Sequence, residues 1–223
     1  MITVHHLENS RSQRILWLLE ELGASYDIKH YKRDAKTNLA PPELLAVHPL
    51  GKSPVLTDGT QTVAESGAIV EYLVETMAPH LRPSVGTDAH RRYAYWMHFS
   101  EGSAMPPLVM KLIFNRIKTA KMPFFARPIA KGIADNVLNS YVQPNIDRQL
   151  AYTNDELKGH DWFCGDTFTA ADIQMSFPLE AAASRGGLEK AKHPHLAAWL
   201  DRIHARPAYR RALERGGPYA FAR

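Results

Sequence analysis

The sequence has 223 residues, of which 45% are hydrophobic and 22% charged, with a formal net charge of +4 at pH 7. This length allows one domain or two small ones with a sizeable core, and the composition is that of a globular protein. Positive charge gathers near the C-terminus, where we expect a solvated helix face, because no aromatic-interleaved basic patch accompanies it and nucleic acid is therefore not expected as a partner. The arginines concerned are Arg202, Arg206, Arg210, Arg211, Arg215 and Arg223.

Cys164 is the only cysteine, which excludes an internal disulfide and a Cys-x-x-Cys redox pair. Its neighbours Trp162, Phe163 and Gly165 favour an inert buried thiol. The eleven histidines show no metal-ligand spacing, so no metal is expected. The first residues form a strand-like run without a basic leader, and no stretch approaches the ~18 apolar residues that a membrane span needs. We therefore expect a cytoplasmic protein.

The first third of the chain alternates between strand and helix patterns. Residues 2–7 predict a strand, 9–12 a turn, and the apolar spacing from Ile15 to Leu22 a helix that Gly23 closes. A second strand is expected over 26–31 and a short helix over 43–47. Val55-Leu56 and Thr62-Val63 predict a hairpin around Asp58-Gly59. A helix opening at Glu65-Ser66-Gly67 completes the order β-α-β-α-β-β-α, which is thioredoxin-like and ends near Pro79.

Beyond a linker at 80–87 the sequence shows only helical periodicity. One helix is expected from Asp88 toward Met105, interrupted or kinked at Pro106-Pro107, with 108–118 continuing a helical hairpin. Another covers 126–157, with a kink expected at Pro144. Thr169-Ala-Ala-Asp172 predicts a capping box, and Pro194 begins the last clear amphipathic helix. The predicted fold is an α/β thioredoxin-like domain, 1–79, followed by an all-α domain, 88–223.

Residues 48–69 hold three devices in order. Ser53-Pro54 is an X-Pro bond at the start of an apolar run, where a cis peptide is expected. The hairpin follows, and Glu65-Ser66 then opens a helix whose free N–H groups suit a carboxylate. This arrangement, together with Phe168–Ile173 and His193–Trp199, resembles the cytosolic glutathione S-transferase family. Asn9–Arg14 and Pro49–Pro54 further resemble bacterial members related to a fungal branch.

The resemblance implies a site for glutathione as co-substrate. The backbone of Ser53 before cis-Pro54 would pair with the cysteinyl part, Glu65 and Ser66 would hold the γ-glutamyl end, and Lys52 would pair with a carboxylate of glutathione. Lys52 is otherwise a solvated loop lysine. Thr169 and Asp172 would have a structural role. His98 would touch the electrophile or a partner subunit, because the resemblance implies a homodimer.

The resemblance places an activating Tyr, Ser or Cys after the first strand, and the position four residues before an arginine matches Ser10 relative to Arg14. Ser10 is therefore the first choice for donating a hydrogen bond to the glutathione thiolate, since such donors lower a thiol pKa. Ser12 and Asn9 are close enough to serve instead. The competing interpretation is a capping box, because Ser10-x-x-Gln13 fits that motif too. The Ser-type turn has neither Tyr nor Cys.

The expected activity is attack of the thiolate on a hydrophobic electrophile, or reduction of a peroxide. Two alternatives remain open on the sequence: a glutathione-dependent disulfide reductase, and a non-catalytic glutathione or hydrophobic-ligand binding or regulatory protein. Fold alone does not decide between them.

Overall fold

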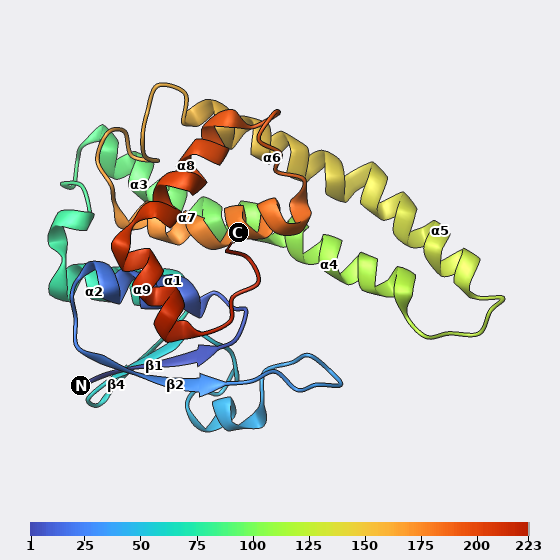
Figure 1. The fold of residues 1–223 in the computed structure, drawn as a ribbon, viewed down its shortest axis with the longest axis horizontal. Helices are drawn as coiled ribbons and strands as arrows, with labels where there is room; N and C mark the ends of the chain where they lie inside the picture. The colour runs from blue at the N-terminus through green and yellow to red at the C-terminus, as the bar shows by residue number, and fades with distance from the viewer. Residues whose placement is uncertain (223) are drawn as a thin grey trace.

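The computed structural model describes residues 1–222. Its N-terminal part is a four-stranded sheet in the order β2-β1-β3-β4 with helices against it (Figure 1). The strands are β1 (Ile2–Leu7), β2 (Tyr26–Tyr31), β3 (Val55–Asp58) and β4 (Gln61–Ala64). β1 pairs in parallel with β2 and antiparallel with β3, and β3 pairs antiparallel with β4. The helices of this part are α1 (Ser12–Glu21), the 3-10 helix Pro42–Ala46 and α2 (Ser66–Met77).

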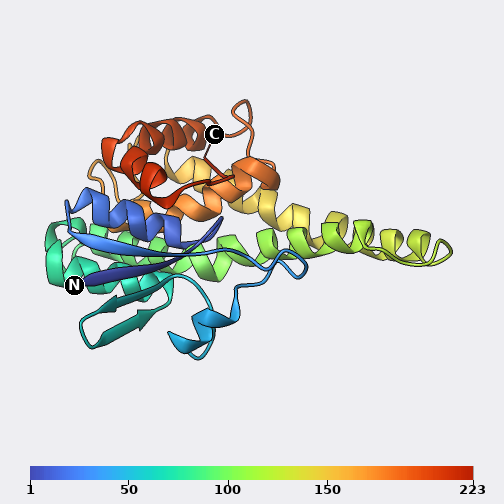
Figure 2. The same ribbon diagram turned by 60° about the horizontal axis from the view of Figure 1, so that its bottom comes forward.

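The remainder of the described chain is helical, so the predicted fold class is confirmed. The helices are α3 (Asp88–Phe99), α4 (Met105–Thr119), α5 (Arg127–Val137), α6 (Gln143–Glu156), α7 (Ala170–Ala181), α8 (Pro194–Ala205) and α9 (Pro207–Gly216). A 3-10 helix, Pro79–Leu81, falls at the start of the expected linker. Figures 1 and 2 both show α4 and α5, with the loop that joins them, as an arm that projects from the helical body.

The sequence predicted an interruption or kink at Pro106-Pro107 and a kink at Pro144, and at both places the chain stays helical. α3 runs into α4 through a π-helical turn, Ser100–Ala104, which ends two residues before Pro106. α5 likewise runs into α6 through a π-helical turn, Leu138–Val142, just before Pro144. Proline lacks the N–H that an α-helix requires, and a local change of hydrogen-bond spacing accommodates that loss without ending the helix.

The C-terminal arginines are not simply a solvated face, which corrects the sequence-based expectation. α9, which the sequence did not predict, lies along α1 (Figure 1). Arg206 pairs with Glu21 at 2.5 Å, and Arg211 and Arg215 pair with Glu20 at 2.8 and 3.0 Å. Arg223 lies outside the described residues. These ion pairs join the last described helix to the first one.

One hydrophobic core extends across both parts of the chain. It contains Val4 and Leu56 from the sheet, Trp17 from α1, and Phe163 and Trp199 from the helical part, all of them fully buried. The capping box at the start of α7 is present as predicted: the Thr169 N–H donates to Asp172 Oδ2 at 2.9 Å. Asp172 Oδ1 also accepts the Trp199 indole N–H at 3.1 Å, so this cap joins α7 to α8. No helix among residues 1–222 is both long and apolar enough to cross a membrane.

Candidate glutathione site

The turn between β1 and α1 carries a chain of three hydrogen-bonding side chains. Ser10 Oγ lies 2.7 Å from Ser12 Oγ, and Ser12 Oγ lies 2.9 Å from His6 Nδ1. All three residues are buried. Burial lowers the pKa of His6 to about 4, with His30 adding to the effect and the Gly216 backbone opposing it. His6 is therefore neutral near pH 7, and one of its ring nitrogens can accept a hydrogen bond.

The capping box that competed for Ser10 is not formed. The residue before the first turn of α1 is Arg11, and the side chain of Gln13 does not bond back to Ser10. Ser10 Oγ instead accepts the backbone N–H of Ser12 at a long 3.3 Å. This leaves the Ser10 hydroxyl beside the amino end of α1, where free N–H groups and the helix dipole favour an anion.

The Ser53-Pro54 bond is cis, as expected from the sequence. The Ser53 side chain fastens this corner to β1: its hydroxyl donates to the carbonyl of His5 at 2.8 Å and accepts the N–H of Leu7 at 3.1 Å. These two bonds extend the contact of β1 beyond its last paired residue on β3, which is Val55. The Ser53 side chain is thus fully engaged with β1, and it fixes the Ser53 backbone beside the turn between β1 and α1.

Glu65 and Ser66 begin α2. Glu65 has φ +73°, a conformation that is unusual for a residue with a side chain and that concentrates at functional sites. Its carbonyl accepts the N–H of Ile69 at 2.9 Å, while its side chain is exposed on the cavity side. Ser66 is buried as the first residue of the helix. An acidic group therefore stands beside a helix N-terminus, which suits a ligand carrying both an ammonium and a carboxylate.

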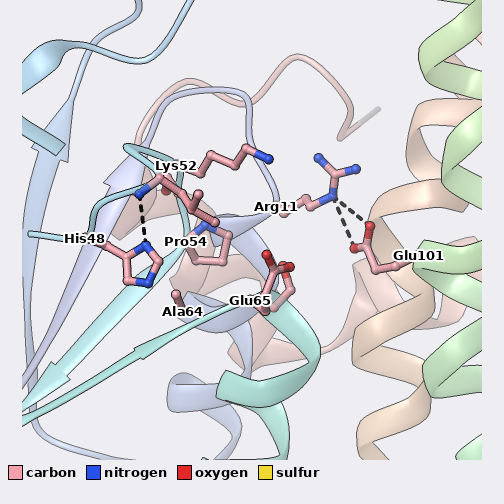
Figure 3. A pocket seen from close by; sticks show the side chains of 10 residues that line it. Arg11, His48, Lys52, Pro54, Ala64, Glu65 and Glu101 are labelled. Atoms are coloured by element: carbon pink, nitrogen blue, oxygen red, sulfur yellow. Dashed lines mark hydrogen bonds and ion pairs between the residues drawn. The ribbon is translucent and has the colours of Figure 1, made fainter. Parts of the chain in front are cut away.

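The cis-proline corner and the start of α2 line one cavity of about 190 Å³ (Figure 3). All five residues predicted to bind glutathione belong to its wall, which consists of Arg11, His48, Leu50, Lys52, Ser53, Pro54, Ala64, Glu65, Ser66 and Glu101. Figure 3 shows the Lys52 amino group directed to the same side as the guanidinium of Arg11, with the Glu65 carboxylate facing the space between α2 and Glu101. The cavity thus has cationic groups at one end and a carboxylate with a helix start at the other.

A second, larger cavity of about 520 Å³ adjoins the first, and the two share Arg11, Leu50, Lys52 and Ser53. Ser10 lines this second cavity. Ser12, fully buried, lines neither and reaches the site only through Ser10. A sulfur held beside Ser53 would therefore have Ser10 on one side and the open second cavity in front.

Two predicted residues lie elsewhere. His98, on α3, lines a separate cavity of about 640 Å³ that shares only Glu65 and Glu101 with the first. Asn9 has its Oδ1 engaged by the backbone N–H of Ala220 at 2.7 Å, near the end of the described chain. Neither contact was visible in the sequence, and the roles of His98 and Asn9 remain predictions.

Arg11 and Glu101 are site residues that the sequence analysis missed. Arg11 Nε lies 3.2 and 3.0 Å from the two carboxylate oxygens of Glu101 across the boundary between the two parts of the chain. The fully buried Arg14 pairs with the same carboxylate. Burial raises the pKa of Glu101, but Arg14 and Arg11 outweigh it and hold that pKa below its usual value. The spacing Arg11-x-x-Arg14 is too common in sequences to indicate ion pairs with a distant carboxylate such as Glu101.

The chemistry of the single cysteine agrees with its sequence neighbourhood. Burial raises the pKa of the Cys164 thiol to about 11, and Thr169 Oγ1 donates to its sulfur at 3.3 Å. Within residues 1–222 no group of three or more His, Cys, Asp or Glu side chains could hold a metal ion.

The comparisons with known proteins fit this site. Residues 1–75 match the family model described as "Glutathione S-transferase, N-terminal domain", and residues 115–207 match "Glutathione S-transferase, C-terminal domain". The chain is 38% identical to glutathione S-transferase 3 of Schizosaccharomyces pombe over 96% of its own length and 88% of that protein. It is 34% identical to glutathione S-transferase 1 of Saccharomyces cerevisiae over 96% and 95% of the two chains.

A solved glutathione S-transferase from Actinobacillus pleuropneumoniae superposes with a TM-score of 0.80 at 33% identity, covering 100% of this chain and 96% of that one. The fold and the cavity thus define a thioredoxin-like, glutathione-binding class of protein. The chain belongs to the glutathione S-transferase family, whose enzymes use glutathione as co-substrate. The resemblance found in the sequence is confirmed at this level, while the Ser-type and bacterial subgroup remains a prediction.

Proposed function

We propose that this transferase binds glutathione across the first cavity and directs its thiolate into the second. Glu65 and Ser66 take the γ-glutamyl end, the Ser53 backbone takes the cysteinyl part, and Lys52 takes the glycyl carboxylate. The Ser10 hydroxyl donates to the sulfur, and Ser12 supports Ser10 from beneath. The observation that carries this proposal is that Ser10 lines the second cavity and directly precedes Arg11, which lines both cavities.

The proposed reaction is nucleophilic displacement or addition. The thiol proton passes to solvent, the sulfur forms a bond to an electrophilic carbon, and in a displacement the leaving group departs with its bonding electrons. Hydrogen bonding to the anion lowers the thiol pKa, and the fixed position of the sulfur raises the chance of productive contact. With a peroxide, the sulfur would instead attack one oxygen, and the O–O bond would break to release an alcohol. A second glutathione would then convert the resulting sulfenic acid to glutathione disulfide and water.

The experiment compares binding and turnover. Calorimetry of the wild type should show glutathione binding that collapses in a Glu65→Ala, Ser66→Ala double variant. Ser10→Ala should keep binding but lower kcat by roughly 10- to 100-fold, because a hydrogen bond to a charged group contributes roughly 1.5–3 kcal/mol. Ser140→Ala, an exposed serine on the π-helical turn before α6, is the matched control. A folded wild type that does not bind glutathione would refute the proposal.

The same experiment separates the alternatives. Binding without turnover of any electrophile or peroxide would favour a carrier or regulatory protein. Turnover restricted to mixed disulfides would favour a reductase, although the half-buried Cys164, with its raised pKa, offers no reactive thiolate for one.

We also propose a homodimer in the cytoplasm. The family resemblance supports the dimer. His98, on the exposed side of α3, is the candidate for a contact with the partner subunit. Light scattering behind size exclusion, on wild type and His98→Ala, measures the mass of the assembly. A monomer at micromolar concentration would contradict the proposal.

A further inference from the structure

The second cavity has a composition that points to a particular kind of electrophile. Its walls are mainly apolar, and it contains three cations, Arg11, Arg33 and Lys52, with no carboxylate among its lining residues within the described 1–222. The apolar surface comes from the segment between β2 and the cis-proline, namely Leu39, Ala40, Pro41, Pro42, Leu45 and Leu50. Three of these leucines are more than half exposed, so this wall is open to a ligand.

Two of the three cations already have assigned partners. Arg11 directs its Nε at the carboxylate of Glu101. Lys52 lines the first cavity as well as the second, and there it faces the proposed position of the glycyl carboxylate. Arg33 lines only the second cavity. It is the cation left for a different ligand.

Arg33 is held in place but its charge is not neutralised by an ion pair. Its guanidinium donates to two neutral carbonyls, those of Asn38 at 3.2 Å and Asn9 at 3.3 Å. The carboxylate of Glu8 accepts the backbone N–H of Arg33 at 3.0 Å and forms no hydrogen bond with the guanidinium. None of the ion pairs among residues 1–222 includes Arg33. A guanidinium fixed by its neighbours and facing a cavity is prepared to bind an anion.

Two other arginines lie close enough to Arg33 for their charges to act on it. Burial lowers the pKa of Arg33; the charge of Glu8 opposes this, and the charges of Arg116 and Arg11 lower the pKa further. Burial is the main cause that lowers the pKa of the half-buried Arg185, and the charge of Arg116, exposed on α4, lowers that pKa further. Arg11, in the turn after β1, and Arg116, on α4, therefore add positive charge beside Arg33 that favours anionic ligands, while Glu8 opposes them.

We propose that the electrophile of this transferase is an apolar molecule carrying a carboxylate or a comparable anionic group, and that Arg33 binds this group in the second cavity. This inference rests on the proposed transferase function. The apolar body would lie on the leucine and proline wall, with the reacting carbon turned toward Ser10. Arg33 is then a residue that determines which electrophile is accepted, and it takes no part in activating the sulfur.

The test uses two chloronitroarenes, a carboxylate and its methyl ester, which differ in charge and by one methyl group. 4-Chloro-3,5-dinitrobenzoate and its methyl ester both react by forming a carbon–sulfur bond to glutathione and releasing chloride, while the thiol proton goes to solvent. The ester is intrinsically the more reactive of the two. Each kcat/KM is therefore divided by the rate constant for the uncatalysed reaction with glutathione, so that only the preference of the enzyme remains.

Wild type is expected to favour the carboxylate by about tenfold, as for a charge-assisted pair in a half-buried site. Arg33→Gln should remove that preference while leaving the ester and the KM for glutathione unchanged. Arg33→Lys should keep part of it. Lys121→Gln is the control, because it removes the same charge from the loop between α4 and α5, at the tip of the arm (Figure 2). The control should keep the full preference.

Three results would overturn the proposal. Wild type could consume both compounds without a preference, or Arg33→Gln could slow both equally. Arg33→Gln could instead raise the KM for glutathione and keep the preference, which would assign Arg33 to the glycyl carboxylate. In all three cases the transferase function itself would stand. Binding of glutathione with no consumption of either compound would overturn this proposal alone, because the transferase function fails only when no electrophile and no peroxide is turned over.

Discussion

The guanidinium of Arg14 on α1 is fully buried and forms an ion pair with Glu101, which lies on the π-helical turn between α3 and α4. The same guanidinium donates to Ser100 Oγ at 3.2 Å and to the carbonyl of Gln174 on α7. Glu101 also binds Arg11 at the cavity wall. A single carboxylate therefore connects the core between the two parts of the chain with the glutathione site.

Glu101→Gln should destabilise the protein more than Arg14→Met. The first change leaves a buried guanidinium without its counter-charge, which costs about 3–5 kcal/mol in the free energy of unfolding. The second change removes the charge itself, and Ser100 Oγ, at 2.8 Å, still satisfies the Gln174 carbonyl, so its cost should be about 1–2 kcal/mol. Urea denaturation measures both.

Asp88→Asn is the control for this pair of variants, because the ion pair of Asp88 with Arg91 is largely exposed and should contribute at most about 1 kcal/mol. If Glu101→Gln cost no more than Asp88→Asn, the buried pair would not contribute in the way its geometry indicates.

His6 should make stability depend on pH. Burial lowers the pKa of His6 to about 4, against 6.5 when unfolded, so between these values the unfolded chain binds a proton that the folded chain does not. The stability that neutral His6 contributes to the folded state is fully present above pH 6.5. It is lost as the pH falls toward 4, which lowers the free energy of unfolding by roughly 3 kcal/mol at most. His6→Asn should flatten the difference between unfolding free energies at pH 7 and pH 4.5. The exposed His80→Asn should leave that difference unchanged, and equal behaviour of the two variants would contradict the assignment.

Gly216 marks the closest approach of α9 to α1. A Cβ at this position would lie 2.5 Å from Gln13 Oε1 and 2.9 Å from Leu16 Cδ1, so Gly216→Ala should destabilise by roughly 1–3 kcal/mol. Gly132, inside α5, has nothing within 4 Å of such a Cβ, and Gly132→Ala should stabilise by roughly 0.5–1 kcal/mol. Opposite signs in thermal or urea unfolding are the expected result. A neutral Gly216→Ala would mean that the two helices can separate at little cost.

Cys164 should be unreactive. With its pKa raised by burial to about 11, its thiolate fraction at pH 8 is roughly 200-fold below that of an ordinary cysteine. Alkylation by iodoacetamide, followed by mass spectrometry, should be slower than that of a model peptide by about this factor. Cys164→Ala should leave turnover unchanged. Rapid alkylation, or loss of turnover in the variant, would reopen a thiol-based mechanism.

The local patterns of the first part of the chain were predicted well. Both parallel strands, 2–7 and 26–31, have the predicted bounds, and the cis-proline corner, the hairpin and the start of α2 follow in the predicted order. Each of these signals depends on neighbouring residues. The five residues predicted to bind glutathione come from only two short segments, 52–54 and 65–66, which explains why the sequence could group them.

The missed features depend on residues far apart in the chain. Arg11 and Glu101 are 90 positions apart, and Arg215 and Glu20 are 195 apart, so no local pattern could pair them. A proline in a helix shows that a hydrogen bond is lost, but not how the helix compensates. The π-helical turns before Pro106 and Pro144 were therefore expected only as kinks.

The packing of α9 against α1 has a consequence for folding during synthesis. The sheet and α1 are synthesised well before α9, since Glu20 on α1 and its partner Arg215 on α9 are 195 positions apart. Until the segment 207–222 is made, the apolar face of α1 stays open, and Asn9 lacks the backbone N–H of Ala220 that holds it. We therefore expect the N-terminal part to remain loosely ordered until the segment 207–222 has been made, and the glutathione site to become complete only then.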